Sequence, residues 1–311
     1  GLKPQTLNIS GVNFANFLTA ITNNGGNITL SNTDFIKNKS ASDGGAIYND
    51  SGKLTIKSNS NFIYNKANNG GAIYNKGTLS INKSTVGGQH NEGIYYIMDR
   101  NINYSNGEDH IMSDGSAVYG ETTIQTDSDS EITYNVDGYL GSDDWITIYY
   151  LVPEWKDIRG KLTDDESSFN KYWVHIYPLG NEAASGAGIY NEGTATISGT
   201  TFKYNIAEEN GGGIYNSGKL TLKSSDLYYN IAQKGGGLYN ATEDNTQLKT
   251  TVQSSTFRAN KADNGAGAYV DSGYITFKND YFGVYGESQS NRATNGGGIY
   301  NSGNNTQVLS T

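Results

Sequence analysis

Short runs of alternating apolar and polar residues recur along the chain. Examples are Leu54-Thr-Ile56, Leu79-Ser-Ile81 and Ala195-Thr-Ile197, each starting two residues after a glycine. Successive side chains of a strand point to opposite faces, so this alternation predicts strands of three to five residues. Gly, Asn, Asp and Ser separate the runs, as tight turns require.

A second apolar position usually follows each run after five residues. The pairs are Leu30 and Phe35, Ile197 and Phe202, Leu222 and Leu227, Val252 and Phe257, and Phe277 and Phe282. Several of these phenylalanines open an F-x-x-N motif, namely Phe35–Asn38, Phe62–Asn65, Phe202–Asn205 and Phe257–Asn260. Each repeat is therefore expected to hold two or three short strands.

A six-residue pattern, G-[GA]-[AG]-[IL]-Y-N, precedes these runs. Its clear copies are Gly44–Asn49, Gly70–Asn75, Gly186–Asn191, Gly211–Asn216, Gly235–Asn240 and Gly296–Asn301. We interpret Gly115–Gly120 and Gly265–Val270 as degraded copies and Gly93–Tyr95 as a fragment. The step is 26 residues from Tyr48 to Tyr74 and 24 from Tyr215 to Tyr239.

Strands this short in repeats of about 25 residues predict a coil whose turns stack in parallel. The predicted fold is an all-β, single-stranded parallel β-helix (β-solenoid). Leu54, Ile56 and Phe62 are expected to point inward and to meet their equivalents on neighbouring turns. Roughly ten to twelve turns, about 4.8 Å apart, would make a rod on the order of 50 Å long. A propeller blade needs about 40 residues, and leucine-rich repeats have another consensus.

The repeated tyrosines and asparagines are expected to form ladders. Identical residues in register stabilise stacked strands, and stacked amides satisfy the backbone groups of turns. For the tyrosines a second interpretation is open, because an exposed ring stack can bind sugar rings.

One segment interrupts the repeat. Tyr119 and Tyr190 are 71 residues apart, where one turn needs about 25. All three tryptophans lie in this interval. We therefore predict a β-rich insertion at 119–185 off one side of the coil, between β-helix turns at 1–118 (irregular over 91–118) and at 186–311. The C-terminal end is expected to be cut from a longer array.

Two strand-like runs, Trp145–Val152 and Tyr172–Tyr177, lie within the insertion, and the acidic stretch Thr163–Ser168 between them is expected to be an exposed loop. We expect a small β-hairpin or subdomain. Rigid aromatic side chains on a displayed segment are good anchors for a partner. The candidate ligand-binding residues are Trp145, Tyr150, Trp155, Tyr172, Trp173, His175 and Tyr177. Alternatively, the tryptophans are the insertion's own small core.

The amino-acid composition argues against several classes of function. The net charge is −9, and the four arginines are scattered, which argues against a nucleic-acid partner. The chain has no cysteine, which excludes disulfides, thiolate zinc sites and cysteine nucleophiles. It contains no run of about 18 apolar residues, so no transmembrane helix is expected.

Metal and catalytic sites are not predicted, and no cofactor is expected. Asp127-Ser-Asp129-Ser-Glu131 looks like the start of a calcium loop but lacks the Gly and Glu of an EF-hand at the sixth and twelfth positions. Another oxygen-ligand calcium geometry stays open there. Parallel β-helices include polysaccharide-degrading enzymes, whose chemistry needs paired carboxylates. The residues after successive Tyr-Asn pairs are Asp50, Lys76, Glu192, Ser217 and Ala241, which form no acidic ladder.

The paired GGAI and FxxN motifs resemble the repeats of the polymorphic outer membrane protein family and of related autotransporter passenger domains. Gly44–Ile47 and Gly70–Ile73 carry the first motif literally, and the resemblance covers residues 7–90 and 186–311. It implies a right-handed β-helix exposed on the bacterial cell surface, used in adhesion and normally followed by a membrane β-barrel. This chain shows no such barrel segment and carries the interruption.

Together these observations predict a non-enzymatic, secreted adhesin fragment. The coil would be a stiff stalk, and the insertion would bind a host glycan or surface protein. The first alternative is a structural spacer of a larger surface protein. The second is a polysaccharide-degrading enzyme or a phage tailspike-like protein.

Overall fold

The computed structural model describes residues 5–88, 93–98, 117–125, 131–139, 145–150, 157–164, 171–177, 180–242, 249–283, 290–303 and 306–310. These residues divide into two compact units. Unit 1 comprises Gly1–Gly88 and Gly180–Thr311, and unit 2 comprises Gln89–Leu179. All regular secondary structure in the described residues is strand, and no helix there could cross a membrane.

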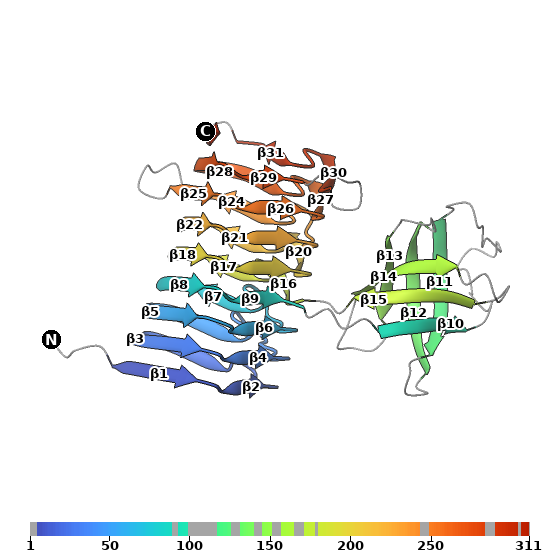
Figure 1. Ribbon diagram of the computed structural model, residues 1–311, viewed down its shortest axis with the longest axis horizontal. Helices are drawn as coiled ribbons and strands as arrows, with labels where there is room; N and C mark the ends of the chain where they lie inside the picture. Colours follow the sequence, from blue (N-terminus) through green and yellow to red (C-terminus); the bar gives the residue numbers. More distant parts are fainter. Residues whose placement is uncertain are drawn as a thin grey trace. The chain divides into compact units, whose positions relative to one another are not determined.

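Unit 1 is a parallel β-helix, which confirms the predicted fold. Equivalent strands of successive turns stack one above another (Figure 1). The first sheet has 14 strands. They are β1 (Thr6–Ser10), β3 (Ile21–Ser31), β5 (Ile47–Lys57), β7 (Ile73–Asn75), β8 (Thr78–Asn82), β17 (Ile189–Asn191), β18 (Thr194–Ser198), β21 (Ile214–Asn216), β22 (Lys219–Lys223), β24 (Leu238–Ala241), β25 (Thr250–Gln253), β28 (Ala268–Lys278), β31 (Ile299–Asn301) and β32 (Thr306–Ser310).

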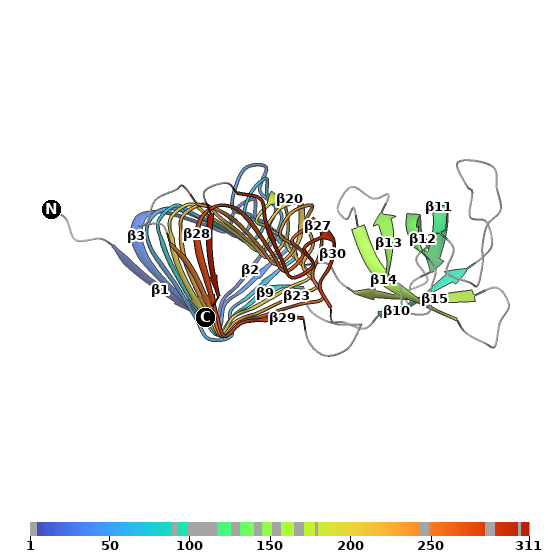
Figure 2. The ribbon, with the colours of Figure 1, turned by 90° about the horizontal axis from the view of Figure 1, so that it is seen from above.

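The F-x-x-N motifs form the second sheet, which has eight strands. They are β2 (Asn13–Ala15), β4 (Asp34–Ile36), β6 (Asn61–Ile63), β9 (Thr85–Gly87), β19 (Thr201–Lys203), β23 (Asp226–Tyr228), β26 (Thr256–Arg258) and β29 (Tyr281–Phe282). On the third side β16 (Glu182–Ser185) pairs with β20 (Ile206–Asn210), and β27 (Lys261–Asn264) pairs with β30 (Arg292–Asn295). Seen from above, the turns follow one another along the same path (Figure 2).

The coil is shorter than expected. One register column of its first sheet stacks nine strands, not the ten to twelve turns predicted, and residues 91–118 belong to unit 2. Nine strands about 4.8 Å apart extend over roughly 38 Å. The core is one side chain deep, as predicted, with Leu54, Ile56 and Phe62 completely buried.

Buried asparagines form two ladders along the coil. In the first, the side-chain amide of each asparagine donates to the Oδ1 atom of the next over Asn23, Asn49, Asn75, Asn191, Asn216 and Asn240, at 2.6 to 3.0 Å. The second ladder comprises Asn38, Asn65, Asn181, Asn205, Asn230, Asn260 and Asn291. In it the Oδ1 atom also accepts the preceding asparagine's backbone N–H. Both ladders satisfy groups that burial would otherwise leave unpaired.

Unit 2 is a closed antiparallel barrel of six strands. They are β10 (Gly93–Met98), β11 (Ala117–Gln125), β12 (Glu131–Tyr139), β13 (Trp145–Tyr150), β14 (Asp157–Asp164) and β15 (Lys171–Tyr177). Pairing of β10 with β15 closes it. The expected degraded repeat at Gly115–Gly120 is therefore not a coil turn, since Ala117–Gly120 pairs antiparallel with β12. The Gly93–Tyr95 fragment likewise lies in β10.

Candidate functional site

The site predicted from the sequence falls in the barrel. Trp145 and Tyr150 are the first and last residues of β13. Tyr172, Trp173, His175 and Tyr177 lie on β15. Trp155 lies outside the described residues, as do Asp127 and Asp129 of the calcium-like sequence. A binding role for these residues stays a prediction.

The two predicted strand runs exist but do not form a hairpin. Strand β14 lies between them and pairs with both. Its Lys161 is the register partner of Trp145 on β13 and of His175 on β15, so these three residues share one row of the sheet. Asp164 belongs to β14, so the strand includes the start of the stretch expected to be an exposed loop.

The barrel is inserted at a single turn of the coil. Before it, Gly88 donates its N–H to the carbonyl of Lys203 at 3.1 Å; after it, Gly180 donates to the carbonyl of Tyr204 at 2.7 Å. The two ends of the insertion thus attach to adjacent residues of one neighbouring turn. Unit 2 begins 30 residues before the predicted boundary at 119 and ends before 185.

The coil keeps its register across the insertion. Ile73, Tyr74 and Asn75 of β7 pair directly with Ile189, Tyr190 and Asn191 of β17. β8 pairs in register with β18, and β9 pairs in register with β19. Removing residues 89–180 from the path leaves Val86-Gly-Gly88 followed by Asn181, which is the spacing of an F-x-x-N motif.

The tyrosine ladder predicted from the repeats is present. Seven rings stack in sequence, with centroids 4.2 to 5.3 Å apart: Tyr48, Tyr74, Tyr190, Tyr215, Tyr239, Tyr269 and Tyr300. Burial raises the pKa of Tyr74, Tyr190 and Tyr239 well above the ordinary value. The neighbouring carboxylate of Glu192 adds to the rise in the pKa of Tyr74. The ladder is therefore a stacked element of the fold.

Alkaline pH should destabilise the coil through this ladder. The folded-state pKa of these tyrosines lies above the unfolded value of about 10, so their contribution is complete below pH 10 and is lost as the pH rises through the folded-state pKa. We expect the free energy of unfolding, measured in urea, to fall above pH 10. Tyr190→Phe keeps the stacked ring but has no hydroxyl, so it should weaken this dependence. Equal pH profiles for the two proteins would contradict the interpretation.

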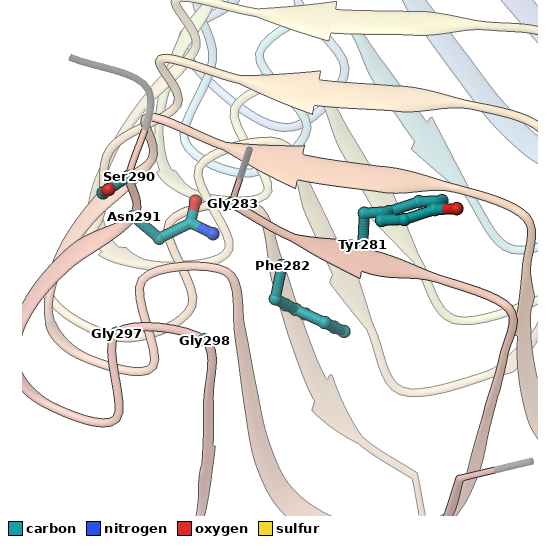
Figure 3. Close-up of a pocket in the computed structure, with 7 residues that line it drawn as sticks. All are labelled: Tyr281, Phe282, Gly283, Ser290, Asn291, Gly297 and Gly298. Atoms are coloured by element: carbon teal, nitrogen blue, oxygen red, sulfur yellow. The ribbon is translucent and has the colours of Figure 1, made fainter. Parts of the chain in front are cut away.

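One pocket of the coil can be compared with the expectation of a carboxylate pair. A shallow pocket near β29 is lined by Tyr281, Phe282, Gly283, Ser290, Asn291, Gly297 and Gly298. Phe282 faces the Gly297–Gly298 turn, and Tyr281 lies on the other side of the strand (Figure 3). This lining contains no carboxylate pair of the kind that glycoside hydrolysis needs. Among the described residues, no group of three or more His, Asp or Glu side chains could hold a metal ion.

The geometry defines a class of protein: a parallel β-helix with asparagine and tyrosine ladders and an inserted antiparallel barrel. The Chlamydia polymorphic membrane protein repeat matches residues 32–50, 59–76 and 199–217. This match confirms the resemblance inferred from GGAI and FxxN, and the repeat belongs to a family associated with the outer membrane and the cell surface. Neither the curated proteins nor the solved structures gave a significant match.

Proposed function

We propose that this chain is a passenger segment of a bacterial surface protein. In this account the β-helix is a stiff stalk, and the β10–β15 barrel is the recognition element, which binds a host glycan or surface protein. The match to a surface-associated repeat family supports a cell-surface location. Adhesion is our extension of that match.

The observation that carries the proposal is the unbroken register between β7 and β17. A barrel that served the coil's own folding would be expected to alter the turns on either side of it. Instead, 91 residues (89–179) are added at one turn while both asparagine ladders continue past them. Repetitive turns present nearly the same surface again and again, whereas the barrel is present once. A unique unit on a repetitive scaffold is typical of a binding element.

The test is binding to host cells and to a glycan array by the intact chain and by a variant that lacks residues 89–180. We expect the intact chain to bind and the variant to lose at least one of the ligands that the intact chain binds. Equal binding by both would reject the barrel as the recognition element. Absence of binding by both would favour the structural spacer.

A further inference from the structure

A cluster of tyrosines and basic residues lies on the outer face of the second sheet. Lys203 on β19, Tyr228 on β23 and Arg258 on β26 are register partners on three successive turns. Tyr204 and Tyr229 directly follow β19 and β23. We call these five residues the tyrosine patch. All are partly exposed.

The three rings of the patch are packed against one another. Tyr204 stacks on Tyr229, with centroids 5.2 Å apart and planes 4° from parallel. Tyr228 stands edge-on to both, at 6.1 and 5.6 Å. The guanidinium carbon of Arg258 lies 4.0 Å from the centroid of Tyr228, and Asp226 holds the guanidinium through two hydrogen bonds of 2.8 and 3.3 Å. These contacts fix the rings as a rigid aromatic surface.

Tyr204 and Tyr229 have an unfavourable backbone conformation. Their φ angles are 59° and 54°, in the left-handed region that the F-x-x-N turn also imposes on Lys37, Tyr64 and Ala259. A residue with a β-carbon costs roughly 1–2 kcal/mol there, and Gly or Asn is tolerated better. Because the turn imposes this conformation at every such position, Tyr204 and Tyr229 are distinguished by the stacking of their rings on adjacent turns.

Lys203 is the cationic residue of the patch that forms no ion pair with a described carboxylate. It is partly buried, and burial lowers its pKa. Within the described chain no carboxylate forms an ion pair with it, although ion pairs are present at Arg258 and Lys66. On the N-terminal turns the same column contains Ala15, Ile36, Ile63 and Gly87, so no charge precedes it. An anionic group beside Lys203 would gain a charge-assisted hydrogen bond.

We propose that the tyrosine patch is a binding site for an anionic saccharide, distinct from the barrel. The tyrosine rings would pack against the apolar face of a sugar ring. Lys203 would pair with a carboxylate or sulfate group of the same saccharide. Aromatic side chains combined with a few polar or charged groups that fix orientation are typical of ligand sites.

The experiment measures binding of a heparin oligosaccharide, sialyllactose and neutral lactose to the full chain by calorimetry. We expect binding of at least one of the two anionic probes and none of lactose. Lys203→Gln and the double variant Tyr204→Asn/Tyr229→Asn should each weaken binding at least ten-fold. The matched control is Tyr64→Asn, because Tyr64 has the same φ near 58° but lies outside the patch. Its affinity should be unchanged.

Two further measurements, the thermal stability of the variants and binding by the chain without the barrel, separate the possible causes of lost binding. Asn tolerates the left-handed conformation, so the tyrosine variants should unfold at the same temperature as the parent or higher, which separates lost binding from lost folding. Binding should also persist without residues 89–180, which separates this site from the barrel. Equal binding of lactose, equal loss in Tyr64→Asn, or no binding of either anionic probe would overturn the proposal.

Discussion

A chain without residues 89–180 is expected to fold as an uninterrupted β-helix. The deletion joins Gly88 to Asn181 and creates Val86-Gly-Gly-Asn, which has the spacing of Phe62–Asn65. The strands before and after the junction, β9 and β19, are already in register. We therefore expect the circular dichroism of a β-protein and one cooperative thermal transition within a few degrees of the coil's transition in the parent, while the host-cell binding that depends on the barrel is lost.

A second deletion provides the control for this variant. Removing residues 89–181 deletes one residue more and takes Asn181 out of the ladder. Asn181 accepts from the backbone and the side chain of Asn65 through one oxygen atom, at 2.9 Å each. The longer deletion should therefore be much less stable than the shorter one. If both variants fail to fold, the barrel is part of the coil's folding unit and the description of an inserted unit is wrong.

Substitution of a central ladder asparagine should be the most damaging point change. Asn205 is completely buried, and its amide donates to the carbonyl of Val86 and to Oδ1 of Asn230. Its own Oδ1 accepts two hydrogen bonds from Asn181. Asn205→Ala leaves several of these groups buried without partners, at about 1–3 kcal/mol each. We expect a loss of about 3 kcal/mol or more in the free energy of unfolding.

The matched variant is Asn291→Ala, at the last described position of the same ladder. Asn291 is only partly buried, so water can replace the partners it leaves. Its substitution should cost about 1 kcal/mol. Urea denaturation of both variants measures the difference. Similar losses of unfolding free energy at the two positions would show that burial does not determine how much a ladder asparagine contributes to stability.

The repeat could be predicted from the sequence because each turn uses the same residues for the same task. Each turn has three segments: a glycine motif, an inward Leu-x-Ile pair and F-x-x-N. Parallel stacking then places each residue next to the equivalent residue of the neighbouring turn. The stacking of Tyr74 on Tyr190 follows from this logic although 116 residues separate them. The two tryptophan-containing runs were also recognised as strands, now β13 and β15.

The extent of the insertion differs from the prediction because a segment inside it resembles a degraded repeat. Gly-Ser-Ala-Val-Tyr-Gly at 115–120 looks like a degraded repeat, yet its partner strand is β12. Barrel closure depends on pairing between β10 and β15, about 78 residues apart, and no local pattern reports such a contact. A better signal was available at the other end. Asn181-Glu-Ala-Ala-Ser matches Asn205-Ile-Ala-Glu-Glu, which marks Asn181 as the ladder residue.

The tyrosine patch was missed for a different reason. Tyr204 and Tyr229 occupy the variable positions of F-x-x-N-like motifs, which periodicity treats as spacers. Their φ angles, and the packing of Arg258 from the next turn, become visible only in three dimensions.

Residues on either side of the barrel belong to adjacent turns of one coil. The chain has no cysteine, so two introduced thiols can be cross-linked without interference. Ser80 and Thr196 are register partners on β8 and β18, whereas Ser80 and Thr276 lie four turns apart, on the order of 19 Å. A short bifunctional thiol reagent should link Ser80→Cys to Thr196→Cys in high yield and should not link Ser80→Cys to Thr276→Cys within one molecule. Failure of the first pair, with both thiols labelled by a monofunctional reagent, would contradict the continuous coil.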